Sequence, residues 1–239
     1  MEICYNKKNK SEGRSEAMTE LEKILSAFGG DDDEFVDYTQ MRRDFEEAMM
    51  MYAGAIREVR TKLEVLNDEF KIRSRRNPIH YINSRIKTPA SILEKMHRRG
   101  YPVTMDSLRE NMHDIAGIRV ICAYGSDIYS IAEMLMKQDD VMVLMVKDYI
   151  KNPKMNGYRS LHLVIEIPVY FSDKKQFIKV EVQIRTMAMD FWASLEHQIR
   201  YKTDGKPSEE ISNELRECAE IIHDTDARME RLYEKMQTM

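Results

Sequence analysis

Polar side chains capable of chemistry alternate with apolar ones along residues 178–186. Such alternation predicts a β-strand with one buried face. The other face carries four long polar side chains: Lys179, Glu181, Gln183 and Arg185. A carboxylate can accept a proton, and cationic groups beside it can bind phosphate oxygens. The same row is also typical of the solvent-exposed side of an antiparallel sheet, so this strand alone does not decide between the two interpretations.

Residues 158–171 predict a second strand with the same division. Apolar side chains fall on one of its faces, and ionisable or aromatic side chains fall on the other: Tyr158, Ser160, His162 and Glu166. The segment 172–175 between the two strands is short enough for a hairpin turn. Two neighbouring strands, each with an apolar face and a reactive face, predict the floor of a site.

The net charge of −4 conceals a basic segment. Residues 71–100 contain 9 lysines and arginines against 1 acidic residue, a net charge of +8. The segments on both sides are acidic, with net charges of −7 for residues 1–70 and −5 for residues 101–239. A basic block of this kind invites a polyanionic ligand. Because the chain as a whole is acidic, a small, highly charged nucleotide fits this pattern better than nucleic acid in general.

The basic segment also has the spacing of a phosphate site. Pro89 is expected in the first turn of a helix, and three polar residues follow it at steps of four and three, which puts them on one helical face. The candidate phosphate ligands are Arg85, Lys87, Ser91, Lys95 and Arg98. Hydroxyl, ammonium and guanidinium groups near a helix N-terminus can hold a triphosphate. On a surface helix, the same residues would only increase solubility.

Asp114 is a second acidic candidate, since it precedes a predicted strand at residues 118–124. Asp114 and Glu181 form the minimum carboxylate set for Mg²⁺, which binds few protein ligands together with substrate phosphates. A lone aspartate before a strand is also typical of a turn. The chain has no Gly-x-x-x-x-Gly-Lys-Ser/Thr loop and no Gly-x-Gly-x-x-Gly turn, so side chains would have to hold the phosphates of a nucleotide.

The elements that must position these residues predict an α+β fold. Apolar residues recur at steps of three and four from Met41 to Phe70 and from Ile211 to Met236, which predicts a long helix near each end. Shorter patterns predict strands at residues 118–124 and 141–146 and helices at residues 127–138 and 187–202. We therefore expect a mixed, partly antiparallel sheet of about five strands flanked by helices.

The chain divides into three parts. Residues 1–40 predict a poorly ordered acidic leader, residues 41–202 a single domain, and residues 203–239 a C-terminal amphipathic helix. Because the apolar stripes of the two end helices exceed what one small domain covers, we expect a homo-oligomer held in part by the C-terminal helix. No apolar run approaches the roughly 20 residues that a bilayer requires. Three widely spaced cysteines fit a reducing, cytoplasmic location.

Several short motifs together resemble the synthetase domain of the RelA/SpoT superfamily. They occur in the family's order: Gly-Tyr-Arg-Ser-Leu-His at residues 157–162, Glu-Val-Gln-Ile-Arg-Thr at residues 181–186, Phe191-Trp192, Glu196-His197 and Tyr201-Lys202. Residues 85–98 and 114–119 resemble the ATP-side motifs of the family. The resemblance runs from residue 79 to residue 202, and the short chain with helices at both ends is similar to the stand-alone small alarmone synthetases.

This resemblance implies a nucleotidyltransferase-like fold and transfer of the β,γ-pyrophosphate of ATP to the ribose 3′-hydroxyl of GDP or GTP, which yields (p)ppGpp and AMP. It implies that Glu181 takes the proton from the 3′-hydroxyl and that Asp114 and Glu181 bind Mg²⁺. The implied ATP-binding residues are Arg85, Lys87, Ser91, Lys95, Arg98 and Arg119. The implied guanine-nucleotide residues are Lys154, Tyr158, His162, Gln183 and Arg185, with Tyr158 stacked on guanine. The small members of the family suggest a tetramer.

Asp190 differs from the asparagine that many members of the resembled family carry at this position. A carboxylate can accept hydrogen bonds from N1–H and N2–H₂ of guanine together, so we expect Asp190 to read the base. The plain alternative is an acidic residue that the helix dipole favours in a first turn.

Two other functions stay open. A nucleotide- or RNA-binding regulator with a degenerate site would use the basic segment and Tyr158 for backbone contact and stacking. The presence of both Asp114 and Glu181 favours an enzyme, and RNA binding has no pattern of its own in support. A nucleotidyltransferase would release pyrophosphate instead of AMP. The sequence predicts neither the preferred guanine nucleotide nor any regulatory ligand.

Overall fold

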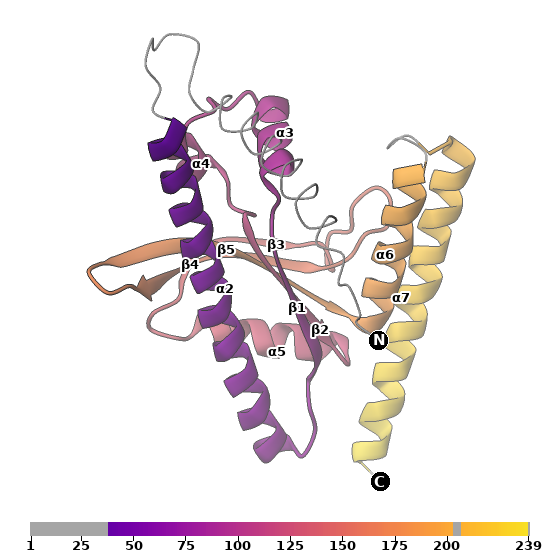
Figure 1. Ribbon diagram of the computed structural model, residues 1–239. Coiled ribbons are helices and arrows are strands. Elements are labelled where there is room, and N and C mark those ends of the chain that lie inside the picture. Colours follow the sequence, from indigo (N-terminus) through magenta and orange to yellow (C-terminus); the bar gives the residue numbers. More distant parts are fainter. Residues whose placement is uncertain (1–37, 203–206, 239) are drawn as a thin grey trace, which may run out of the picture.

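The computed structural model describes residues 38–202 and 207–238 (Figure 1). Residues 1–37 of the expected leader and residues 203–206 at the start of the expected C-terminal segment lie outside the described residues. In the described part, helices flank a five-stranded mixed sheet, which confirms the predicted α+β class. None of the helices in these ranges is long and apolar enough to cross a membrane.

The sheet has the strand order β1-β2-β5-β4-β3. At its centre, β2 and β5 run parallel, whereas the other three neighbouring pairs are antiparallel. The expected hairpin is formed by β4 and β5, and it extends to the left of the sheet in Figure 1. The strands are β1 Ile79–Ile86, β2 Ala116–Cys122, β3 Met142–Asp148, β4 Leu161–Tyr170 and β5 Lys175–Thr186.

Two helices cover the apolar face of the sheet, α2 (Tyr38–Ser74) and α5 (Gly125–Met136). The predicted apolar stripe lies on α2, where Val59 and Leu63 are completely buried in the core. Full burial of an aliphatic side chain contributes on the order of 1.5–3 kcal/mol. Because this face holds the main core, the polar face of the sheet is directed away from it.

Two short helices connect β1 to β2, α3 (Pro89–Arg99) and α4 (Met105–Asn111). The hydroxyl of Thr88 caps α3 by accepting a hydrogen bond from the backbone N–H of Ser91. Pro89 takes the first helical turn as predicted, since the N–H that proline lacks would have no partner there. The start of α3 is therefore fixed next to the end of β1.

Two helices lie side by side at one end of the sheet, α6 (Met187–Lys202) and α7 (Glu209–Gln237) (Figure 1). Both were predicted, and the bounds of α6 match the prediction. The indole N–H of Trp192 donates a hydrogen bond of 2.9 Å to the backbone carbonyl of Leu215, which ties α6 to α7.

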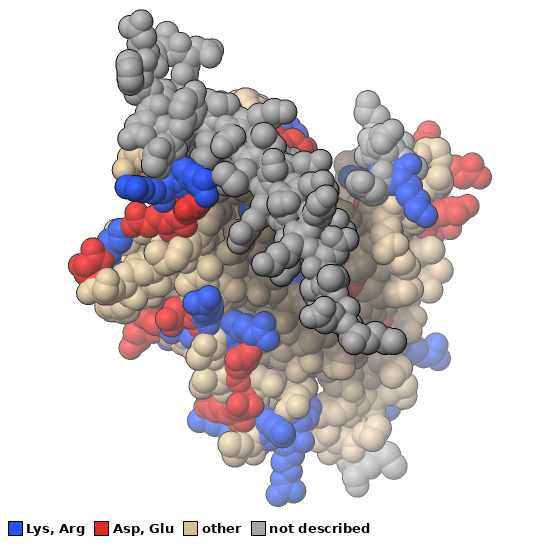
Figure 2. Space-filling view, viewed as in Figure 1, with Lys and Arg blue, Asp and Glu red and all other residues tan. Residues whose placement is uncertain are grey.

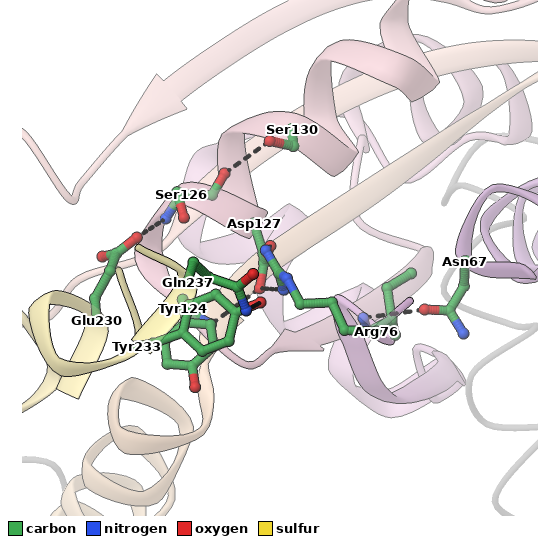
Figure 3. Close-up of polar contacts among 10 residues, drawn as sticks. Asn67, Arg76, Tyr124, Ser126, Asp127, Ser130, Glu230, Tyr233 and Gln237 are labelled. Carbon is green, nitrogen blue, oxygen red and sulfur yellow. Dashed lines mark hydrogen bonds and ion pairs between the residues drawn. The ribbon is translucent and has the colours of Figure 1, made fainter. Parts of the chain in front are cut away.

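A cluster of aromatic and polar side chains joins the last part of α7 to the domain (Figure 3). Tyr233 stacks on Tyr124 with 4.6 Å between ring centroids. Glu230 accepts a hydrogen bond of 2.8 Å from the backbone N–H of Ser126 in the first turn of α5. Beside these contacts, Arg76 pairs with the buried carboxylate of Asp127. The inner face of α7 is therefore fixed along its length.

The sequence pattern missed two elements, α4 and β1. In β1, Ile79, Ile82 and Ile86 are spaced by three and four, which is a helical interval. The strand accommodates this spacing through a register shift between Ile79 and Tyr81. Such a bulge inserts one residue and changes which side chains share a face.

Candidate functional site

The polar row of β5 lies on the face of the sheet opposite the main core, as predicted. Glu181 pairs with Gly117 of β2, and Gln183 pairs with both Arg119 of β2 and His162 of β4. Because paired positions on neighbouring strands share a face, these side chains converge from three strands. Two of these strands, β4 and β5, are those that the alternation indicated, and β2 contributes the third set.

Glu181 lies within a chain of hydrogen bonds. Its Oε1 lies 3.3 Å from Nδ1 of His162, and its Oε2 accepts a hydrogen bond of 3.0 Å from Gln183. Gln183 in turn accepts one of 2.7 Å from Arg185. Burial acts to raise the pKa of Glu181, but the contacts with His162 and Gln183 outweigh it, so the pKa lies below its ordinary value. Glu181 is therefore ionised at neutral pH and can accept a proton.

Asp114 gathers two of the predicted lysines. Lys87, directly after β1, and Lys95 of α3 each place Nζ 2.8 Å from Oδ2 of Asp114. Burial acts to raise the pKa of Asp114, but the two ammonium groups lower it overall. The second oxygen, Oδ1, is buried and has no hydrogen-bond partner within the described ranges. A buried carboxylate oxygen without a partner fits a site that takes up a cation.

Two adjoining clefts open on this face. The larger, of about 950 Å³, is lined by the sheet, the β3–β4 loop, α6 and α7. The smaller, of about 320 Å³, lies over β1, β2 and β5 and is lined by both Asp114 and Glu181. Arg85, Arg119 and Gln183 line both clefts. A ligand in one cleft would therefore lie directly beside a ligand in the other.

The β3–β4 loop forms an aromatic and cationic wall of the larger cleft. Tyr158 lies in this loop and not in the predicted strand, because β4 begins only at Leu161. Its hydroxyl lies 2.8 Å from Nε2 of His162. Lys154 and Arg185 lie over its ring, 4.6 Å and 5.4 Å from the centroid. The residues expected at the acceptor nucleotide are thus brought together.

Asp190 lies in the first turn of α6 but lines neither cleft. Its buried carboxylate accepts a hydrogen bond of 2.5 Å from the hydroxyl of Tyr81. Its Oδ1 also lies 3.3 Å from Arg119 and 3.6 Å from Arg185. In this structure the residue that was expected to read guanine contacts two arginines of the clefts instead.

Four of the predicted phosphate ligands line neither cleft: Lys87, Ser91, Lys95 and Arg98. Ser91 accepts a hydrogen bond from the hydroxyl of Thr88, and Arg98 lies 3.6 Å from Glu94 on the exposed side of α3. On the face that Figure 2 shows, lysine and arginine side chains of the described residues lie among aspartate and glutamate side chains.

Several residues of the larger cleft escaped the sequence analysis. Tyr149 is not part of its lining, but it supports Lys154 from behind, with 4.7 Å between the ammonium group and the ring centroid. The loop, α6 and α7 supply a polar wall: Asn156, Glu196, His197, Arg200, Ser212, Asn213 and Arg216. The Glu196-His197 motif was a signal for α6. The α7 residues gave none, because that helix was recognised by its apolar positions alone.

Across residues 38–202 and 207–238, no three or more His, Cys, Asp or Glu side chains form a group that could hold a metal ion. Asp114 and Glu181 line the same cleft as a pair of carboxylates. The negative charge of Asp114 acts to raise the pKa of Glu181. Such a pair fits an ion that completes its coordination with phosphate oxygens and water.

Comparison with known proteins gave consistent matches. The family model described as "Region found in RelA / SpoT proteins" matches residues 84–206. The GTP pyrophosphokinase YwaC of Bacillus subtilis is 42% identical over 193 residues, which cover 81% of this chain and 92% of YwaC.

Solved structures agree with the sequence matches. Small alarmone synthetase 2 from Bacillus subtilis superimposes with a TM-score of 0.74 at 41% identity, covering 80% of this chain and 99% of that one. Small alarmone synthetase 1 from the same organism, bound to its product pppGpp, has a TM-score of 0.74 at 34% identity and covers 81% and 98%. Its complex with AMPCPP has a TM-score of 0.70 at 31% identity and covers 82% and 100%.

Proposed function

This chain belongs to the RelA/SpoT family, and we propose that it is a GTP pyrophosphokinase that transfers the β,γ-pyrophosphate of ATP to the ribose 3′-hydroxyl of GDP or GTP. The products are (p)ppGpp and AMP. The observation that carries this proposal is the pair of adjoining clefts that share Arg85, Arg119 and Gln183, with Glu181 in the smaller one. Two nucleotides bound there would meet beside a carboxylate that can accept a proton. We place the reaction in the cytoplasm.

The smaller cleft is the proposed ATP site. Arg85 and Arg119 would flank the adenine, and the basic groups around Asp114 would hold the phosphates. Support comes from Lys87 and Lys95, which converge on one point next to this cleft. The proposed phosphate ligands are Lys87, Ser91, Lys95 and Arg98. Because Arg98 is paired with Glu94 on the exposed side of α3, its side chain would have to turn to reach a phosphate.

Asp114 and Glu181 would hold Mg²⁺, whose charge would offset that of the ATP phosphates. The buried and unpartnered Oδ1 of Asp114 supports this assignment. In addition, Lys87 and Lys95 contact only the other oxygen, Oδ2, so Oδ1 is left for the ion.

The larger cleft is the proposed acceptor site. The ring of Tyr158 would stack on guanine, with Lys154, His162, Gln183 and Arg185 around the nucleotide. The ribose would lie at the edge of the larger cleft that is nearest the smaller one. There Glu181 would take the proton from the 3′-hydroxyl. Phosphoryl transfer depends on positioning and charge neutralisation more than on covalent help from the protein. The arginines that line both clefts supply these.

A single assay tests the proposal. The protein is incubated with labelled ATP, Mg²⁺ and GDP, GTP or GMP in turn, and the products are separated. We expect AMP and a 3′-pyrophosphorylated guanine nucleotide, and we expect Glu181→Gln to lower turnover by roughly 10²–10⁴. Release of pyrophosphate would contradict the proposal in favour of nucleotidyl transfer. Binding of nucleotides without turnover would contradict it in favour of a regulator.

We also propose that the protein assembles as a homotetramer through the outer face of α7. Four large apolar side chains there are more than half exposed: Ile221, Met229, Leu232 and Met236. They follow helical steps of three and four, with Thr225 filling the gap. In a tetramer a second interface is needed, and the apolar, exposed strand β3 at the sheet edge offers one.

The charges of α7 favour a second copy of this chain as the occupant of that face. The first part of the helix carries Glu209, Glu210 and Glu214, and the last part carries Arg228, Arg231 and Lys235. A twofold axis perpendicular to the helices would pair two copies antiparallel and bring these acidic residues of each copy near the three basic residues of the other. Light scattering should give a tetramer mass, and Leu232→Glu should reduce it, whereas Ile72→Glu on α2 should not. A monomer mass for the unaltered protein at micromolar concentration would contradict the proposal.

A further inference from the structure

The loop that carries Lys154 and Tyr158 packs directly on α7. Gly157 has a φ of +87°, and a Cβ at this position would lie 2.5 Å from Cβ of Ala219. Such a distance is below any van der Waals contact, so only glycine lets the loop approach the helix this closely. The residue before Tyr158 is therefore in contact with a helix that lies outside the family match at residues 84–206.

Arg159, the residue after Tyr158, fixes the same loop to the same helix. Its side chain is 8% exposed, and its guanidinium donates one hydrogen bond of 3.2 Å to the carbonyl of Gly157 and another of 2.9 Å to Oε2 of Glu220 on α7. Glu220 itself is more than half exposed. A buried guanidinium thus depends on one surface carboxylate for its charge partner, and removal of such a partner leaves a buried charge without compensation.

The loop transmits this position to the acceptor residues. The backbone N–H of Gly157 donates to the carbonyl of Lys154 at 2.8 Å, and the N–H of Lys154 donates to the carbonyl of Tyr158 at 3.2 Å. These bonds make the segment a compact turn, and Tyr158 ends it with the contact to His162. The distance between α7 and the loop therefore sets where the Tyr158 ring lies against the larger cleft.

α7 is held independently of this loop. Trp192 binds the backbone of Leu215 on one side, and Tyr124 and Ser126 bind Tyr233 and Glu230 near its end (Figure 3). The helix is thus a fixed support against which the loop is placed. It also contributes Arg216 to the lining of the larger cleft.

We propose that α7 is part of the acceptor site and that Glu220 is a positioning residue, which holds Tyr158 and Lys154 in place through Arg159. This inference rests on the proposed synthetase function, because it concerns the guanine-nucleotide cleft of that activity. The two substrates should therefore respond differently to the loss of Glu220. The proposed ATP site is built on β1, β2, β5 and α3, none of which Glu220 contacts, so only binding of the acceptor should weaken.

The test is Glu220→Gln, which keeps the shape of the side chain and removes its charge. We expect the KM for GDP to rise about tenfold, or about 1.4 kcal/mol, with the KM for ATP changed by less than about twofold. Glu217→Gln on the same helix is the matched control, since it makes the same charge change at an exposed residue that forms no ion pair with any residue the structure describes, and it should leave both KM values unchanged. Glu220→Asp should recover part of the GDP affinity.

The single tryptophan reports whether α7 stays docked. Trp192 is 5% exposed at the contact between α6 and α7, so its fluorescence emission should be the same in Glu220→Gln as in the unaltered protein. An unchanged KM for GDP in Glu220→Gln would overturn the inference, as would equal increases in the KM values for GDP and ATP. A shifted emission would also overturn it, because the variant would then act by undocking the helix. If the unaltered protein made no (p)ppGpp, the proposed function itself would fail.

Discussion

Nδ1 of His162 lies 3.3 Å from Oε1 of Glu181, while Nε2 of the same ring lies 2.8 Å from the hydroxyl of Tyr158. One neutral tautomer satisfies both contacts: Nδ1–H donates to the carboxylate, and Nε2 accepts from the phenol. His162 therefore links the proposed base to the residue proposed to stack on guanine. Placement of the acceptor and orientation of the carboxylate are coupled through this one side chain.

Two substitutions at Tyr158 separate these roles. Tyr158→Phe keeps the ring and removes the hydroxyl, so the KM for GDP should change little while kcat falls, because His162 loses the partner that fixes its tautomer. Tyr158→Ala also removes the ring. Since stacking of a base on an aromatic side chain contributes about 1–3 kcal/mol, the KM for GDP should rise at least about fivefold. Steady-state kinetics with varied GDP check this, and equal KM values for the two variants would contradict stacking.

Local patterns were sufficient for the centre of the sheet. The alternation in residues 178–186 identified Glu181, Gln183 and Arg185 as one row, because a buried strand face leaves its polar partners at strict intervals of two. Pro89 fixed the start of α3 for an equally local reason. Features of this kind depend on neighbours in the chain, and they need no knowledge of the tertiary structure.

Other features depend on contacts between distant segments. The strand β1 was not predicted from the sequence, because its bulge gives Ile79, Ile82 and Ile86 the spacing of a helix. The contact of Gly157 with Ala219 joins residues 62 positions apart, and no local pattern indicates it. Asp190 was correctly placed in the first turn of a helix. Its arginine partners come from β2 and β5, which are distant in the chain, so the sequence did not indicate them. Guanine was therefore the expected partner, whereas in the structure the carboxylate contacts two guanidinium groups.

Asp190 should act on both substrates if it holds these arginines. Arg119 lines both clefts and Arg185 lines the larger one, so Asp190→Ala should raise the KM values for ATP and GDP together, by about tenfold each for a broken buried ion pair. Asp190→Asn keeps a hydrogen-bond acceptor for Tyr81 and should have a smaller effect.

The alternative role, direct reading of guanine, predicts a different result for Asp190→Ala. The KM for ATP would be unchanged, and the enzyme would accept other bases in place of guanine. Kinetics with varied ATP, varied GDP and an adenine acceptor therefore distinguish the two roles. Asp190→Ala with wild-type KM values for both substrates would contradict both.

Asp226 on α7 makes the stability of the folded protein depend on pH. Burial raises the pKa of this carboxyl above its ordinary value, Glu230 adds to the increase, and contacts with Thr186 and His223 oppose it. The folded state therefore holds the proton more tightly than the unfolded state, so the contribution of Asp226 to stability falls as the pH rises through the raised pKa. Asp226→Asn should increase the midpoint of thermal unfolding at pH 7, and the gain should narrow as the pH is lowered towards 4. A gain that widens in acid would contradict this sign.

The pair formed by Arg76 and Asp127 should matter most for the stability of the domain (Figure 3). Asp127 is 1% exposed and accepts two hydrogen bonds from the guanidinium of Arg76. It also accepts a hydrogen bond from the backbone N–H of Tyr124 at the start of α5. The guanidinium lies 5.2 Å from the ring centroids of Phe70 and Tyr233, so it joins α2 to α7 as well.

Removing one partner of such a buried pair leaves the other charge without compensation. Asp127→Asn should therefore lower the free energy of unfolding by about 3–5 kcal/mol, measured by urea denaturation. The control is Arg60→Gln, which breaks the exposed pair with Glu64 on α2 and should cost less than about 1 kcal/mol. Similar losses in the two variants would contradict the prediction, because they would mean that solvent screens the Arg76–Asp127 pair as fully as it screens the surface pair.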